Sequence, residues 1–211
     1  MMKALLSILL IVVVALVVGD LALRSFAEDR MADAVEAALE IPADAEVSVD
    51  AFPFVVSTFQ GRYPGVTVEA EDVGEGSVHL SRLQLEFSDV EFSLSNLLSG
   101  DERRVRLGAG EGEALVRERD LNRALRSEGI SARVDLQPSG AVEVESTDGS
   151  LSGAADVSLE GSSLVVSPEA DLPSFSLELP VFGTDMSYDS VDVRGSTARL
   201  GVSVGETVAE F

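Results

Sequence analysis

The 211-residue sequence contains no cysteine, no tryptophan and a single histidine. The absence of cysteine excludes disulfide bonds, thiolate catalysis and cysteine metal sites, and it is compatible with either redox compartment. His79 lies in a strand-like stretch, so neither a Ser-His-Asp triad nor a histidine metal site is expected. Positive charge is also scarce, because 15 basic residues stand against 37 acidic ones and leave a net charge of −22. This balance argues against nucleic acid as a partner, since phosphate contacts require clustered cations.

Cofactor motifs are missing as well. The glycine-rich run at 108–113 lacks the third glycine of G-x-G-x-x-G and the lysine of a P-loop, so we interpret it as a turn at a strand end. Acidic residues are numerous, but no calcium-binding loop motif is present and no acid pair has a recognisable spacing. The sequence therefore predicts no cofactor, no metal and no enzyme, with a carboxylate-dependent hydrolase as a minor alternative.

One long apolar run is present, at residues 4–23, and Asp20 is its only charge. About 20 helical residues span the roughly 30 Å hydrocarbon layer, so the run predicts a membrane-insertion segment. A cleaved signal peptide is the alternative, but Val17-Val18-Gly19 is a poor match to a small-x-small cleavage site. We expect an uncleaved anchor and, because the acidic body follows the only apolar segment, an extracytoplasmic body. If the segment is cleaved, the body is secreted.

The sequence divides into this N-terminal segment, residues 1–24, and a single domain, residues 25–211, which is long enough to bury one core. Apolar residues at helical spacing predict a helix over 27–39, and Ser25-x-x-Glu28 is a candidate capping box that would start it separately from the anchor. The same spacing predicts short helices over 52–59, ending at Gly61, and over 120–127, with Asp120 as a candidate cap.

After Gly65 the apolar period changes from 3.6 to 2, which predicts strands. A phase slip around Ser88-Asp89 indicates a bulge or tight turn. Alternation then continues to the end of the chain, interrupted by turn sequences. The predicted fold class is α+β, with long antiparallel strands and a few short helices after the membrane segment.

Four segments resemble the LmeA-like phospholipid-binding proteins of actinobacterial cell envelopes. They are AED-x-x-A-x-A-x at 27–35, AFPFVVSTFQGRYPGVTVEAEDV at 51–73, RDLNRAL at 119–125 and LP-x-F at 179–182. The resemblance covers roughly residues 20–205. It implies a half-unit of a tubular lipid-binding fold, in which a curved antiparallel sheet wraps a helix and leaves an apolar groove. It also implies an envelope protein that binds phospholipid and supports the maintenance of envelope lipids or glycolipids.

An apolar lining is all that acyl chains require, because each methylene removed from water contributes about 0.8 kcal/mol. The bulky residues expected on the inward faces supply this lining, and the alternative is that they pack together as an ordinary core. The candidate lining residues are Phe52, Phe54, Val55, Phe59, Leu83, Leu85, Phe87 and Phe92.

The lipid phosphate calls for arginine, whose fork of donors matches phosphate oxygens. Arg62 follows the predicted aromatic helix, and Arg103 and Arg104 begin a basic cluster, so these three are the candidate headgroup residues. The alternative is a solvated face whose arginines pair with Asp101, Glu102, Glu118 and Asp120. The full cluster is Arg103, Arg104, Arg106, Arg117, Arg119, Arg123 and Arg126.

The leading hypothesis is thus a membrane-tethered, extracytoplasmic phospholipid-binding protein without catalytic activity. The runner-up is an anchored interaction module with a packed core, which binds an envelope protein partner through its acidic face. That alternative predicts salt-sensitive association with a basic partner, since exposed charges are screened within about 10 Å at 0.1 M salt.

Overall fold

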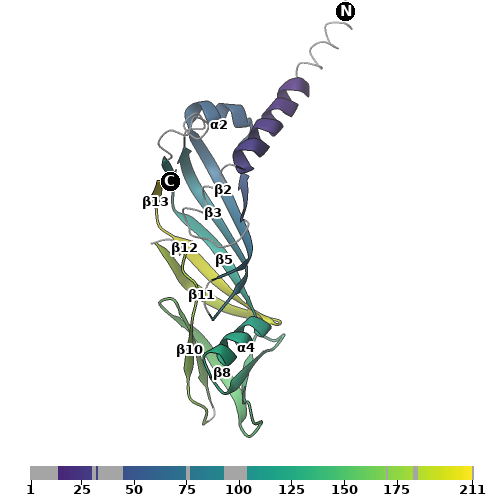
Figure 1. Ribbon diagram of the computed structural model, residues 1–211, viewed down its shortest axis with the longest axis vertical. Coiled ribbons are helices and arrows are strands. Elements are labelled where there is room, and N and C mark those ends of the chain that lie inside the picture. The colour runs from purple at the N-terminus through teal and green to yellow at the C-terminus, as the bar shows by residue number, and fades with distance from the viewer. Residues whose placement is uncertain are drawn as a thin grey trace, which may run out of the picture.

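The computed structural model describes residues 14–29, 32, 45–74, 77–92, 104–169, 171–182 and 185–210. The molecule is elongated, with α2 (Phe54–Gln60) near one end and α4 (Glu118–Ser127) in the other half (Figure 1). A helix over residues 14–29 projects from the end that carries α2. The two helices that the sequence predicts over 52–59 and 120–127 are thereby confirmed.

An eight-stranded sheet forms the half of the molecule that carries α2. Its main path runs β1-β2-β3-β5-β12-β11, while β4 pairs with β3 and β13 pairs with β4. Every pairing is antiparallel, and the sheet curls into a half-barrel. The strands are β1 (Ala45–Val49), β2 (Arg62–Val73), β3 (Leu80–Phe92), β4 (Arg104–Leu107), β5 (Gly110–Arg117), β11 (Met186–Arg194), β12 (Thr197–Val204) and β13 (Thr207–Glu210).

A second sheet, of five antiparallel strands in the order β10-β9-β8-β7-β6, forms the other half together with α4. Strand β8 of this sheet lies beside β11 of the first sheet. The division into two sheets differs from the single curved sheet that the resemblance implies. The strands are β6 (Ala132–Leu136), β7 (Val142–Ser146), β8 (Ser152–Glu160), β9 (Ser163–Pro168) and β10 (Phe175–Glu178).

Strand alternation sets the burial pattern, as the sequence predicts. Strand β2 buries Val66, Val68 and Ala70 while the residues between them are more exposed, and β12 buries Ala198, Leu200, Val202 and Val204 in the same way. The phase slip in β3 lies at Asp89, which has a φ of 51° and, like Pro64 opposite it, has no partner in the β2–β3 register. The register is the same on both sides of this pair, so no residue is inserted and the strand continues; the predicted bulge or tight turn is instead a local backbone distortion. The distortion shifts the alternation by one residue, so that Phe87 and Val90 are both buried.

Strand β6 is an edge of the second sheet, and α4 covers it. The buried Asn122 amide donates to the Val134 carbonyl at 2.7 Å and accepts from the Val134 N–H at 2.9 Å, as a neighbouring strand would. The Glu118 carboxylate accepts from the Leu136 N–H at 3.1 Å. Since unpaired edges invite association with other chains, these side chains close an edge that the sheet leaves open.

Three local predictions are wrong. The helix 14–29 runs through Ser25 without a break, so Ser25-x-x-Glu28 is no capping box. Arg117 occupies the N-cap position of α4, and Asp120 lies in the first turn instead. Residues 110–113 of the glycine-rich run are part of β5, and only 108–109 form the connection from β4. The predicted helix over 27–39 lies mostly outside the described residues.

The fold is thus mostly β, with a curled half-barrel sheet and short helices. Within the part of the chain that the structure describes, no helix has the length and apolar character needed to cross a membrane. The predicted segment 4–23 lies partly outside that part, because its described portion begins at residue 14.

Candidate functional site

The inner face of the eight-stranded sheet is a continuous apolar surface. Residues paired directly across antiparallel strands point to the same side. Leu83, Leu85 and Phe87 of β3 pair with Ala114, Gly112 and Gly110 of β5, which in turn pair with Leu200, Val202 and Val204 of β12. Large side chains on β3 and β12 therefore flank a strip of small residues along β5. We call these nine residues the inner apolar face.

The two glycines of this strip are required by close packing. A Cβ atom on Gly110 would lie 2.7 Å from the ring of Phe87, which covers that position. A Cβ atom on Gly112 would lie 2.0 Å from the carbonyl oxygen of Gln84, in the backbone of the neighbouring strand. Only glycine permits this approach of β3 to β5.

The structure divides the predicted lining residues into two groups. Leu83, Leu85 and Phe87 lie on the inner apolar face and are 1–2% exposed. Phe54 is also buried, where its ring packs against Tyr63 with 5.6 Å between centroids. By contrast, Phe52 and Phe59 are 77% and 90% exposed, and Val55 is exposed beside them. Phe92 ends β3, and its side chain lies outside the described residues. The role of all eight as a lipid lining remains a prediction.

The exposed residues of α2 are held in place by a hydrogen-bonded contact between α2 and the helix 14–29. Pro53 precedes α2 and offers no side-chain cap, so the first N–H groups of α2 need another acceptor. The Asp20 carboxylate supplies it, accepting from Phe54 N–H at 2.9 Å and from Val55 N–H at 2.8 Å. The sequence marks Asp20 only as the single charge in an apolar run, and its contact with residues 34 and 35 positions away has no local signal.

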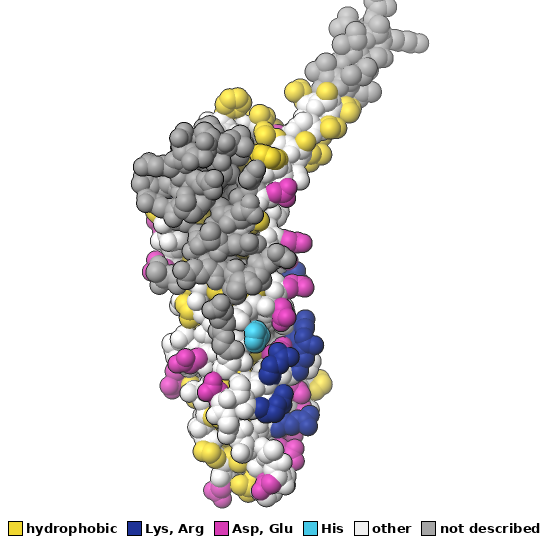
Figure 2. Space-filling model, in the orientation of Figure 1, with side chains coloured by type: hydrophobic (Ala, Val, Ile, Leu, Met, Phe, Trp, Pro, Cys, Tyr) yellow, Lys and Arg dark blue, Asp and Glu magenta, His cyan; other side chains and the backbone are white. Residues whose placement is uncertain are grey.

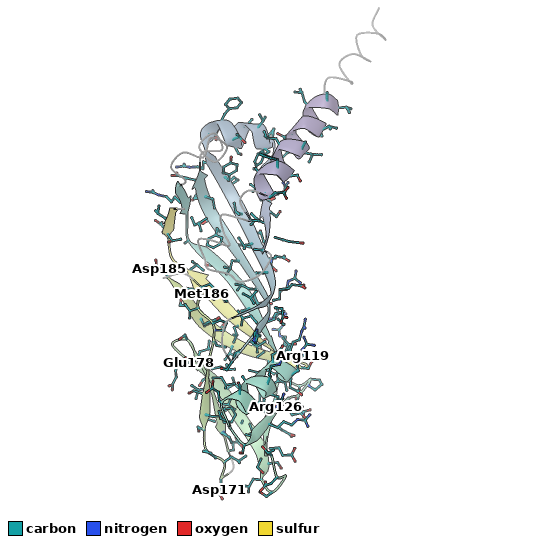
Figure 3. All side chains as sticks on the ribbon, viewed as in Figure 1. Arg119, Arg126, Asp171, Glu178, Asp185 and Met186 are labelled. Carbon is teal, nitrogen blue, oxygen red and sulfur yellow. The ribbon has the colours of Figure 1, made fainter. Side chains whose placement is uncertain are left out.

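Replacing Asp20 with alanine should release α2 from the helix 14–29, because loss of an N-cap costs about 1 kcal/mol, or roughly a fivefold change in equilibrium. Hydrogen exchange at the Phe54 and Val55 amides is expected to accelerate about fivefold. Asp171→Ala, at an exposed position at the opposite end of the molecule (Figure 3), is the control and should leave both amides unchanged. Equal protection in both variants would contradict the capping role.

A second carboxylate of the same helix also reaches the body. Glu28 accepts from the Val49 N–H at 2.9 Å and from the Arg24 guanidinium at 2.8 Å. Val49 ends β1, which is an edge strand of the eight-stranded sheet. The helix 14–29 is therefore bonded to the body at α2 and at β1.

Among the candidate headgroup residues, Arg62 is described fully. Its guanidinium lies 2.5 Å from the Glu91 carboxylate, which accepts its hydrogen bond; this contact raises the pKa of Arg62 and lowers the pKa of Glu91. Glu91 pairs with Arg106 on its other side, so the two arginines flank it across β2, β3 and β4. Arg103 and the side chain of Arg104 lie outside the described residues.

The basic cluster predicted from sequence is divided in space. Arg106 belongs to β4 beside Glu91, whereas the later members lie on or next to α4, where Figure 2 shows dark blue side chains and Figure 3 labels Arg119 and Arg126. Asp120 is 2% exposed and lies 3.2 Å from Arg123 and 3.6 Å from Arg119. Arg119 and Arg123 of α4 thus share one buried carboxylate.

A hollow of about 490 Å³ lies at the turn between β7 and β8 of the second sheet, lined by Ser131, Ser146, Thr147, Asp148, Ser150 and Leu151. Hydrogen bonds from Ser150 and Ser146 lower the pKa of Asp148 to about 2. In the described ranges no three His, Asp or Glu side chains are grouped so that they could hold a metal ion.

The structure thus defines the class of protein as a curled, mostly β domain whose sheet has a continuous, buried apolar inner face. A family model described as LmeA-like phospholipid-binding matches residues 18–206, and the chain belongs to this family. The family is a lipid-binding family and not an enzyme family. Comparison with curated proteins and with solved structures returned no match.

Proposed function

We propose that the protein is tethered by residues 4–23 to a membrane, with its body on the extracytoplasmic side, and holds phospholipid by its acyl chains against the inner apolar face. Membership of a phospholipid-binding family carries the ligand class. The observation that carries the site is the face itself, in which nine cross-strand neighbours are apolar without a single polar side chain. In that role the protein would support maintenance of envelope lipids or glycolipids.

The energetics of such a site are favourable. About ten methylenes moved from water onto an apolar surface contribute about 8 kcal/mol. Because Leu83, Leu85 and Phe87 are 1–2% exposed, a bound chain takes the place of protein atoms that now cover them. The side chains of Phe87 and Leu85 lie over Gly110 and Gly112, so these two side chains are among the groups that an inserted chain displaces.

Photocrosslinking tests the proposed site. The full chain is reconstituted in phosphatidylcholine vesicles that contain a phospholipid with a diazirine near the end of its acyl chain, and adducts are mapped after illumination. Trypsin cuts after Arg82 and Arg199, so residues 83–92 of β3 and 200–204 of β12 fall in segments 83–103 and 200–211, separate from the N-terminal segment. We expect adducts at 83–87 and 200–204.

Adducts confined to residues 1–30 would contradict lipid binding by the sheet, because a bilayer around the N-terminal segment is enough to produce them. Strand β8, in the second sheet, is the internal control and should carry none. An unlabelled sheet would leave the alternative, an anchored interaction module that binds an envelope protein through its acidic face.

A further inference from the structure

The outer surface of α2 is an exposed apolar patch, made of Phe52, Val55, Val56 and Phe59. Phe54 and Thr58 occupy the opposite side of the helix, where the Phe54 ring is buried and the Thr58 hydroxyl donates to the Phe54 carbonyl at 3.0 Å. The patch residues are therefore directed outward, with two phenyl rings more than three-quarters exposed. Contiguous exposed apolar groups on a soluble domain mark a contact surface, whereas scattered ones do not.

The neighbouring helix indicates what covers the α2 patch. Asp20 bonds α2 directly to the helix 14–29, whose own exposed residues include Val14, Leu16, Val18 and Leu21. Figure 2 shows hydrophobic side chains on both elements at the same end of the molecule. The sequence stays apolar from there back to residue 4. The patch is thus continuous with the segment that enters the bilayer in the proposed function.

The net charge of the protein also bears on how the α2 patch would contact a bilayer. A net charge of −22 repels an anionic membrane surface, so contact with it must come from apolar groups. The α2 patch contains no charged residue, and Arg62, at its C-terminal border, is paired with Glu91. Aromatic side chains on a short amphipathic element are suited to the interfacial layer of a bilayer.

We propose that the α2 patch inserts into the interfacial layer of the bilayer that receives residues 4–23, as a second membrane contact of the body. This inference rests on the membrane tether of the proposed function, but not on lipid binding by the sheet. It assigns the exposed phenylalanines to the surface of a membrane, while the β3 residues remain the candidate acyl-chain lining.

Depth-dependent fluorescence quenching tests the inference. The chain has no cysteine, so Phe59→Cys carries a single environment-sensitive label in the full protein. The protein is reconstituted in phosphatidylcholine–phosphatidylglycerol vesicles with a nitroxide near the headgroup end of the acyl chain. We expect a blue-shifted emission and at least threefold stronger quenching than for a label at Ser162→Cys, an exposed turn between β8 and β9.

A matched variant separates insertion from mere proximity to the tether. Phe52→Ser combined with Val56→Ser removes two exposed side chains without touching the core, so the circular dichroism melt should not change. Quenching of the Phe59→Cys label should then fall by at least half. Unchanged quenching, or a label that stays in water in the parent protein, would overturn the inference, as would energy transfer between copies showing that the patch pairs with itself.

Vesicle flotation and the crosslinks of the sheet distinguish this failure from failure of the proposed function. Flotation without quenching overturns only the α2 contact, and loss of flotation overturns the tether and the inference together. Quenching without crosslinks at 83–87 and 200–204 supports the α2 contact and contradicts lipid binding by the sheet.

Discussion

Replacing Gly112 with alanine is expected to lower the free energy of unfolding by about 3 kcal/mol, at the upper end of the usual range for overpacking. The added Cβ would meet the Gln84 carbonyl oxygen at 2.0 Å and the Leu85 Cα at 2.9 Å. Both are backbone atoms of a paired strand, so relief requires β3 and β5 to separate. Urea denaturation followed by circular dichroism measures the loss.

Gly65→Ala is the matched control, because Gly65 is also in a strand and its Cβ would meet only the Asp50 Cβ, at an ordinary 3.4 Å. We expect a change within about 1 kcal/mol there. Similar losses in the two variants would indicate that glycine content, and not the approach of β3 to β5, limits stability. Gly112→Ala should also reduce acyl crosslinks at 83–87, since it disturbs the strip of small residues along β5.

Replacing Asn122 with alanine is expected to cost about 3 kcal/mol of stability, because each buried polar group left unpaired costs about 1–3 kcal/mol. The Val134 N–H and carbonyl would both lose their partner, and Asn122 is 7% exposed, so water does not replace it freely. Denaturation measures the total, and hydrogen exchange at the Val134 amide locates the change at β6.

Arg126→Ala, at an exposed position of the same helix, is the control and should change stability by no more than about 0.5 kcal/mol. If Asn122→Ala changed stability no more than Arg126→Ala does, the pairing of Asn122 with β6 would contribute little to the stability of the fold. Asn122→Asp offers a sharper test. A carboxylate still accepts from the Val134 N–H but opposes the Val134 carbonyl, so this variant should also be destabilised.

Local features of the fold could be predicted from the sequence. Helical spacing and Gly61 located α2, and Gly61 indeed adopts a left-handed φ of 65° at its end. The period of 2 located the strands, and the phase slip at Ser88-Asp89 located the backbone distortion at Asp89 of β3. These features depend on residues within a few positions of one another, which is the range over which apolar periodicity is informative.

Features that depend on distant contacts could not be predicted. The partition into two sheets is decided by pairing of segments far apart in the chain. The spacing of Phe52, Phe54 and Phe59 along the chain is the same whichever side of α2 faces the core. Periodicity alone therefore did not separate the buried ring of Phe54 from the exposed rings of Phe52 and Phe59. The glycines at 110 and 112 resembled a turn because the approach of a neighbouring strand leaves no local mark.

The two carboxylates of the helix 14–29 that bond to the body also constrain how the protein can move. Asp20 and Glu28 are eight residues apart, or about 12 Å along a helix, and eight residues turn the helix by about 80° beyond two full rotations, so the two carboxylates bond to the body from adjoining sides of the helix. A helix bonded to the body at two such points has a fixed orientation relative to the body and is not a flexible linker. Any tilt or axial twist of the N-terminal helix would therefore be transmitted to the half-barrel as a rigid rotation.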